Sequence, residues 1–198
     1  MCYIRKMNKL VCITGLCGSG KSVVSDYLVN KKNFEFLRFG QITLDKIKKE
    51  GLELNEVTEK RVREEFRKLY GMAAFVILNL EKLKKLLRKG NVVGDGLYSF
   101  EEYKILKENF GNKFVVIAVY APPKLRYERI SGRKMDKNDI ALRNRSLSKT
   151  EAESRDFAEI ENLNKGGTIA MADYTIVNTK DIKFLEKQLE EIIYEIEN

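Results

Sequence analysis

The 198-residue sequence contains no histidine, only two prolines and only three cysteines. Without histidine, Ser-His-Asp and Cys-His catalysis are excluded, and so are the usual zinc sites. Any proton transfer therefore has to use a carboxylate, a lysine or water. The cysteines, Cys2, Cys12 and Cys17, are odd in number and clustered. This pattern indicates reduced thiols of a cytoplasmic protein and not a disulfide framework.

Long apolar stretches are also missing. No run of about 18 apolar residues is available to cross a membrane. The segment Met1–Lys9 lacks the apolar core of a secretory signal. We therefore expect a cytoplasmic protein without a membrane partner. Met7, directly before the first predicted strand, is an alternative start to Met1.

The net charge is +8. A basic protein attracts polyanions, either nucleic acid over an extended surface or the clustered phosphates of small metabolites. A nucleic-acid surface would carry basic side chains interleaved with exposed aromatic ones. Here the basic residues gather near the motif described below, so we expect a small phosphorylated ligand and no nucleic acid.

Short apolar runs alternate with longer helical patterns, which is typical of βαβ units and a mostly parallel sheet. The five expected strands are Leu10–Thr14, Phe34–Phe39, Val92–Asp95, Phe114–Tyr120 and Tyr174–Val177. Apolar residues recur at helical spacing from Val62 to Leu87, which predicts a long core-facing stripe that Gly71 divides into two helices. Ser99, followed three residues later by Glu102, predicts a capping box at a helix start.

One motif follows the first strand directly and opens a helix. Gly15-Leu16-Cys17-Gly18-Ser19-Gly20-Lys21-Ser22 fits the G-x-x-x-x-G-K-[ST] pattern of a phosphate-binding loop. Its glycines let the main chain approach phosphate, its N–H groups form an anion nest, and the helix start adds positive charge. Lys21 is expected to contact the β- and γ-phosphates of ATP, and Ser22 to hold Mg²⁺. Cys17 has no evident resolving cysteine, so we interpret it as an exposed loop position.

Further candidates lie downstream. Arg126, Arg129 and Arg133 are spaced to share a helix face and would repel without an anion. The polar segment that follows carries Arg143, Arg145 and Arg155. Asp95 ends the third strand at the edge of the sheet where ligands bind, and is either a partner of Mg²⁺ or a proton acceptor.

A second basic cluster, Arg61, Arg63 and Arg67, lies on the long helix. Intrahelical pairs, such as Glu59 with Arg63, offer one explanation. A clamp for the phosphate of an acceptor is the other. Asn178-Thr179-Lys180-Asp181 has the wrong order for a guanine-reading motif, so guanine specificity is unsupported.

Several segments together resemble nucleotide kinases of the adenylate kinase and dephospho-coenzyme A kinase group. They are the phosphate loop, Asp95-Gly96, Arg129-Ile-Ser-Gly-Arg133, Arg155-Asp156 and Ala172-Asp173-Tyr174-Thr-Ile-Val-Asn178. The sequence is most similar to a mainly archaeal family of adenylate-kinase-related P-loop proteins, over almost its whole length. The resemblance implies an α/β P-loop NTPase fold of three layers, with a five-stranded parallel sheet flanked by helices and a helical lid. It also implies one domain over residues 1–198, with acceptor-binding helices near residues 40–70 and the lid near residues 126–160.

The resemblance assigns roles to four residues. Arg129 would stack on the donor adenine, Arg133 would touch the phosphates, and Arg155 would be a later lid arginine. Asn178 would lie by the adenine. The acceptor half of the site departs from the adenylate kinase pattern in two places. The segment Gly40-Gln41-Ile42-Thr43-Leu44 lacks the expected aspartate and arginine. After Asp95-Gly96, where related kinases often have an arginine, this chain has Leu97-Tyr98.

These observations predict an ATP- and Mg²⁺-dependent phosphotransferase acting on a small phosphorylated acceptor, first of all a nucleoside monophosphate. A hydroxyl acceptor such as dephospho-coenzyme A is the second possibility. The rival from another class is a switch or assembly factor that hydrolyses ATP slowly, which the missing acceptor motif favours. The sequence leaves open whether the protein is a monomer or a homodimer.

Overall fold

The computed structural model describes residues 7–133 and 146–198. Five parallel strands form one sheet in the order β2-β3-β1-β4-β5. The strands are β1 (Leu10–Thr14), β2 (Glu35–Arg38), β3 (Val92–Asp95), β4 (Phe114–Tyr120) and β5 (Tyr174–Val177). All five expected strands are present, and the second is shorter by one residue at each end.

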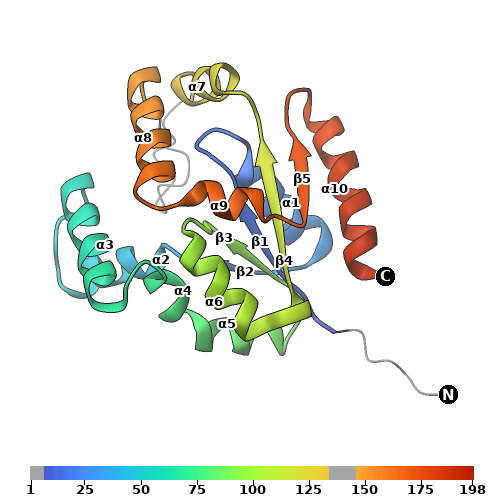
Figure 1. Ribbon diagram of the computed structural model, residues 1–198, viewed down its shortest axis with the longest axis horizontal. Coiled ribbons are helices and arrows are strands. Elements are labelled where there is room, and N and C mark those ends of the chain that lie inside the picture. Colours follow the sequence, from blue (N-terminus) through green and yellow to red (C-terminus); the bar gives the residue numbers. More distant parts are fainter. Residues whose placement is uncertain (1–6, 134–145) are drawn as a thin grey trace.

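Helices cover both faces of this sheet (Figure 1). They are α1 (Lys21–Lys32), α2 (Gln41–Lys49), α3 (Glu56–Tyr70), α4 (Ala74–Ile77), α5 (Leu80–Leu87), α6 (Phe100–Phe110), α7 (Pro123–Ser131), α8 (Lys149–Glu161), α9 (Lys165–Ala170) and α10 (Ile182–Glu197), with a 3₁₀ turn at Gly111–Lys113. Within the described ranges, no helix is long and apolar enough to cross a bilayer.

Two apolar cores result from the alternation of side chains along each strand. Leu10 and Cys12 of β1 face a core shared with α4, α5 and α6. Val11 and Ile13 face the opposite core, shared with α1 and α10. The fold is therefore the three-layer P-loop architecture that the sequence predicts.

The long helical pattern that ends at Leu87 is broken more than predicted. Gly71 does end α3, with a positive φ of 73° that glycine adopts without strain. Two short helices, α4 and α5, follow in place of one. The stripe is also not buried along the whole of α3: Val62 is buried, whereas Leu69, on the same face in the last turn of the helix, is 64% exposed. The prediction of a continuous core-facing stripe was wrong at Leu69.

Three helix starts match their sequence signals. The capping box of Ser99 and Glu102 is present at the start of α6. A second capping box, formed by Ser148 and Glu151, starts α8. At α7, Pro122 occupies the N-cap and Pro123 the first turn, where a missing N–H costs nothing.

The carboxyl ends of the strands bring distant segments together. The loop after β1, the end of β3 and the turn after β5 all lie at this edge, and α7 and α8 pack against each other beyond it (Figure 1). Ligands bind at this edge in open α/β sheets.

Candidate functional site

The loop that joins β1 to α1 is held in a shape that favours glycine at three positions, the first of which, Gly15, has a φ of 135°. Gly18 and Gly20 have φ values of 77° and 105°. A side chain at Gly18 would come within 2.6 Å of the Arg126 carbonyl oxygen. A side chain at Gly20 would overlap the amide nitrogen of Asn178. The loop therefore depends on glycine both for its backbone angles and for its close packing.

Two polar side chains of this loop, those of Ser19 and Lys21, bear on ligand binding. The hydroxyl of Ser19 is buried and makes no hydrogen bond within the described part of the chain. The Lys21 ammonium group donates a 3.0 Å hydrogen bond to the carbonyl oxygen of Leu16. Burial lowers the pKa of Lys21 to about 8, and the charge of Lys165 adds to this shift. A polyphosphate at this loop would supply negative charge for the desolvated lysine and acceptor oxygens for groups such as the unpaired Ser19 hydroxyl.

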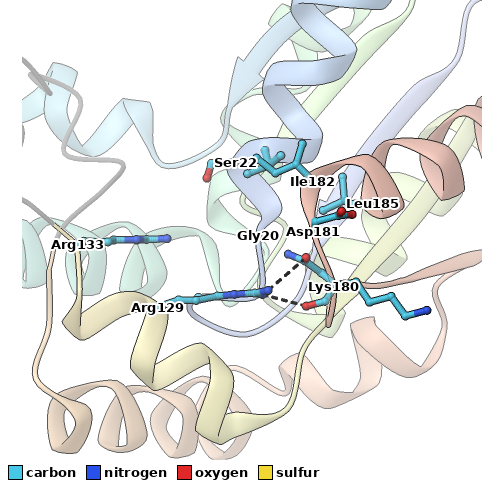
Figure 2. A pocket seen from close by; sticks show the side chains of 11 residues that line it. Gly20, Ser22, Arg129, Arg133, Lys180, Asp181, Ile182 and Leu185 are labelled. Atoms are coloured by element: carbon cyan, nitrogen blue, oxygen red, sulfur yellow. Dashed lines mark hydrogen bonds between the residues drawn. The ribbon is translucent and has the colours of Figure 1, made fainter.

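A cavity of about 250 Å³ opens beside the loop. Figure 2 shows side chains from four segments around it. The lining residues are Gly18, Gly20, Ser22, Val23, Arg129, Arg133, Asn178, Lys180, Asp181, Ile182 and Leu185. The cavity thus has apolar side chains from α1 and α10 and two arginines from the end of α7. This combination suits an aromatic base with phosphates next to it.

The side chain of Asn178 binds the phosphate loop directly. Its side-chain amide donates a 2.8 Å hydrogen bond to the Ser19 carbonyl oxygen. Arg129 donates to the main-chain oxygen of Asn178 at 2.9 Å and to its side-chain oxygen at 3.5 Å (Figure 2). The Asn178 side chain is therefore occupied in bracing the phosphate loop.

Two candidate magnesium partners lie at the same edge. Asp95 ends β3 and is aligned with Ile13 of β1, two residues before the phosphate loop. Its charge acts on the pKa of Lys21. Ser22 lines the cavity. Within residues 7–133 and 146–198, no group of three side chains is suited to hold a metal. This donor set fits Mg²⁺, which is commonly held by one or two protein oxygens together with phosphates of the substrate.

The prediction that Arg126, Arg129 and Arg133 share one face of a helix is wrong for Arg126. Its side chain is only 3% exposed and forms a 2.6 Å ion pair with Asp156 of α8. It also donates to the carbonyl oxygens of Ala121 and Cys17. Arg126 thus ties α7, α8 and the phosphate loop together from inside the protein. The repulsion that sequence spacing implies is relieved by Asp156.

Arg155 precedes Asp156 on α8, and its side chain is 44% exposed. Its Nε donates to Glu159 at 3.0 Å. Its neighbour Asp156 pairs with Arg126, which donates to the Cys17 carbonyl oxygen, so this part of α8 is connected to the phosphate loop. Arg143 and Arg145 lie outside the described residues.

The arginines of α3 differ from one another. Arg61 is exposed. Arg63 pairs with Glu59 at 3.1 Å and with Glu56 at 3.5 Å. Arg67 is partly buried, with its guanidinium group 5.4 Å from the Phe75 ring centre. Of the three, Arg67 alone remains a candidate for binding an acceptor anion.

Sequence reasoning missed two residues near this site, Lys165 and Glu159. Lys165 is almost completely buried and pairs with Glu159 at 2.6 Å. Its ammonium group lies 4.2 Å from the centre of the Tyr98 ring. Both Lys165 and Glu159 act on the pKa of Lys21. No local pattern marks them, because their contacts join separate elements. Cys12 and Cys17 are free thiols, as expected, and Cys2 lies outside the described residues.

Solved structures with the same fold include several small-molecule kinases. A TT1252 structure from Thermus thermophilus superposes with a TM-score of 0.64 at 21% identity, covering 96% of this chain and 98% of that chain. Shikimate kinase from Acinetobacter baumannii in complex with shikimate gives 0.60 at 20% identity, covering 96% of each chain. A gluconokinase from Sinorhizobium meliloti gives 0.51 at 12% identity, covering 96% and 99%. At these identities the likeness establishes the fold alone.

Sequence relatives are more informative. Residues 11–156 match an AAA domain family. A UPF0200 protein from Thermococcus onnurineus is 32% identical over 190 residues, covering 94% of this chain and 97% of the relative. One from Sulfurisphaera tokodaii is 34% identical over 190 residues, covering 95% and 97%. The expected likeness to an archaeal family of P-loop proteins is thus confirmed, and the chain belongs to the UPF0200 family.

Proposed function

We propose that this protein is an ATP-dependent phosphotransferase that moves the γ-phosphoryl group of ATP to a small phosphorylated acceptor. The observation that carries the proposal is the phosphate loop itself, whose buried Ser19 hydroxyl lacks a protein partner and whose Lys21 is desolvated. A triphosphate supplies the negative charge and the acceptor oxygens that these groups lack. The kinase folds of the structural neighbours agree with this function.

The donor would lie across the loop and the neighbouring cavity. Its base would occupy the cavity beside Arg129, with Ile182 and Leu185 on the apolar side. Main-chain N–H groups of the loop and Lys21 would hold the β- and γ-phosphates, and Arg133 would reach the phosphate chain. Ser22 and Asp95 would hold Mg²⁺, which draws charge from the phosphate oxygens when bound. The likeness of this arrangement to adenylate kinases is part of the proposal.

Transfer breaks the bond between the γ-phosphorus and the bridging oxygen, while an oxygen of the acceptor forms the new bond. Negative charge grows on the leaving ADP and is spread over the transferring group. Lys21 and the arginines from α7 and α8 would offset that charge. Asp95 can accept the proton if the acceptor is a hydroxyl group.

The acceptor would enter between α2, α3 and the end of β3. Arg67 offers a positive charge there, which favours an acceptor with a phosphate or carboxylate group. A nucleoside monophosphate is the first class to test. Hydroxyl acceptors come second, because the segment 40–44 lacks the adenylate kinase signature and one structural neighbour is a kinase in complex with shikimate.

The missing acceptor signature also keeps the switch or assembly factor as a second candidate function. Such a protein would hydrolyse ATP slowly and would not transfer phosphate to any small molecule. The two candidates therefore make different predictions for the same assay.

The test combines a binding measurement with an acceptor screen. Calorimetry with Mg·ATP should show binding that Lys21→Met weakens strongly. ATP consumption is then measured with nucleoside monophosphates, dephospho-coenzyme A, shikimate and gluconate, each against a water-only control. An acceptor that accelerates ATP consumption well above hydrolysis supports the transferase. If no acceptor exceeds water, the switch is favoured, and if Mg·ATP does not bind, the proposal is wrong.

A further inference from the structure

The carboxylate of Glu159 lies between two cations from different helices. Its Oε2 accepts a 2.6 Å hydrogen bond from the Lys165 ammonium group, and its Oε1 accepts one of 3.0 Å from the Nε of Arg155. Lys165 is 1% exposed and the Glu159 side chain 7%, whereas Arg155 is 44% exposed. A buried ion pair thus lies beneath an arginine that reaches the surface.

Burying such a pair is costly. Each charge loses several kcal/mol of hydration, and an apolar pair of similar volume is often as stable. Burial by itself would raise the pKa of Glu159, but Lys165 and Arg155 outweigh it and lower this pKa to about 2. The carboxylate therefore stays ionised at neutral pH. Because stability does not explain the pair, its position in the fold is informative.

The pair is placed between the phosphate loop and the end of β3. Lys165 rests on the Tyr98 ring, three residues beyond Asp95. The Thr168 hydroxyl of the same helix, α9, lies 3.4 Å from the Tyr98 carbonyl oxygen. On the other side, Asp156 fixes α8 to Arg126, which donates to Cys17 of the loop. The backbone around Arg155 is therefore fixed on one side by contacts to Tyr98 and on the other by the pair of Asp156 with Arg126.

The two terminal nitrogens of the Arg155 guanidinium group remain available to bind an anion. Only its Nε is used by Glu159, and in the described part of the chain its two terminal nitrogens make no hydrogen bond. Because Lys165 already donates to the other oxygen of Glu159, a two-pronged grip on Arg155 would have to compete with Lys165. If Lys165 were absent, such a grip would form, since it is the preferred geometry of an arginine with a free carboxylate.

We propose that Lys165 is a positioning residue: by sharing Glu159, it keeps the terminal nitrogens of Arg155 directed to the phosphate end of the loop. This inference rests on the proposed function. Lys165 itself is too buried to touch a ligand, so it acts through Arg155. In this arrangement Arg155 offsets charge on the transferring phosphoryl group, and its loss slows transfer more than it weakens ATP binding.

The test is a double-mutant cycle on the full-length chain. The variants are Lys165→Met, Arg155→Met and the double variant. For each we measure kcat and the KM for Mg·ATP. The assay uses the acceptor found by the screen, or ATP hydrolysis if the screen finds none. Lys165→Met should lower kcat by about 10–100-fold, the loss expected for one charge-assisted hydrogen bond. KM should change less than about threefold, because the interaction is made in the transition state. In the Arg155→Met background, Lys165→Met should have little further effect on kcat.

Two further variants separate positioning from folding. Lys165→Met with Glu159→Gln removes the carboxylate that would otherwise capture Arg155 and should recover most of kcat, even if the single variant is poorly folded. Lys104→Met is the matched control, because Lys104 also lies over an aromatic ring, 5.0 Å from the Phe100 ring centre, but is exposed. It should leave kcat unchanged.

The proposal is overturned if the losses from Lys165→Met and Arg155→Met multiply, or if the folded variant with Glu159→Gln stays as slow as the single one. Lys165 would then act directly or only on stability. If the wild type binds Mg·ATP but only hydrolyses it, the transferase proposal fails, while the cycle on hydrolysis still decides the role of Lys165.

Discussion

The side-chain amide of Asn178 donates a 2.8 Å hydrogen bond to the carbonyl oxygen of Ser19, across 159 positions of the sequence. The turn after the last strand is thereby tied to the phosphate loop after the first. Asn178 is 8% exposed, so the bond is shielded from water. A structural change in the cavity beside Arg129 can therefore alter the loop that would hold the phosphates.

Asn178→Ala should weaken binding of Mg·ATP by about tenfold. The loss of one buried neutral hydrogen bond costs about 1 kcal/mol, and the freed Ser19 carbonyl adds to this cost. Calorimetric titration measures the effect. Asn109→Ala is the control, because that amide donates a similar 2.9 Å bond to Ile105 on the exposed side of α6. Equal affinity for both variants would show that the Asn178 contact does not support the loop.

ATP binding should depend on pH through Lys21. Its pKa in the free protein is lowered to about 8, first by burial and then by Lys165. A polyphosphate favours the protonated form, so above pH 8 binding has to take up a proton. Affinity should be nearly constant from pH 7 to 8 and then fall, by up to about tenfold per pH unit. Titrations in two buffers of different ionisation enthalpy measure the proton uptake directly.

Lys21→Met provides the contrast for this pH dependence. The variant should bind Mg·ATP weakly and with the same affinity from pH 8 to 9.5, because the titrating group is gone. If wild type and variant lose affinity in parallel, another group titrates and the assignment to Lys21 is wrong.

The buried ion pair of Arg126 and Asp156 should be important for stability. Removing one partner leaves an unpaired buried charge, so Arg126→Met should lower the free energy of unfolding by about 3–5 kcal/mol. Denaturant unfolding measures this loss. Arg126→Met with Asp156→Leu should regain a large part of it, because no lone charge remains. The control is Lys60→Met, since the exposed pair of Lys60 with Glu64, at 3.9 Å, contributes at most about 1 kcal/mol. A loss of similar size in both single variants would contradict the prediction.

The local parts of this site could be predicted from the sequence. The phosphate loop obeys a contiguous pattern, and its neighbours, a strand and a helix, are set by short-range periodicity. Asp95 was found because it ends a strand at the edge of the sheet that binds ligands. The positions of Arg129, Arg133 and Asn178 near the loop followed from a family resemblance, and they line the cavity beside it.

The partners of buried charges could not be predicted in the same way. Arg126 meets Asp156 across 30 positions, and this pairing depends on how α7 packs on α8. From spacing alone, Arg126 is indistinguishable from Arg129. Lys165 stands in a polar stretch where an exposed lysine is the ordinary expectation. Only the fold, which brings it onto Tyr98 and Glu159, reveals that it is buried.

Arg67 should distinguish the acceptor from the donor. It is a partly buried arginine of α3 that forms none of the ion pairs described for Arg63, and burial lowers its pKa, although Glu102 partly compensates. Arg67→Met should raise KM for an anionic acceptor by about tenfold or more, the loss expected for a hydrogen bond to a charged group. Affinity for Mg·ATP should be unchanged, because Arg67 does not line the cavity beside the loop. Arg61→Met, on the exposed side of the same helix, should alter neither quantity. If Arg67→Met weakens ATP binding instead, or if Arg61→Met has the same effect on the acceptor, the acceptor does not bind beside α3 as proposed.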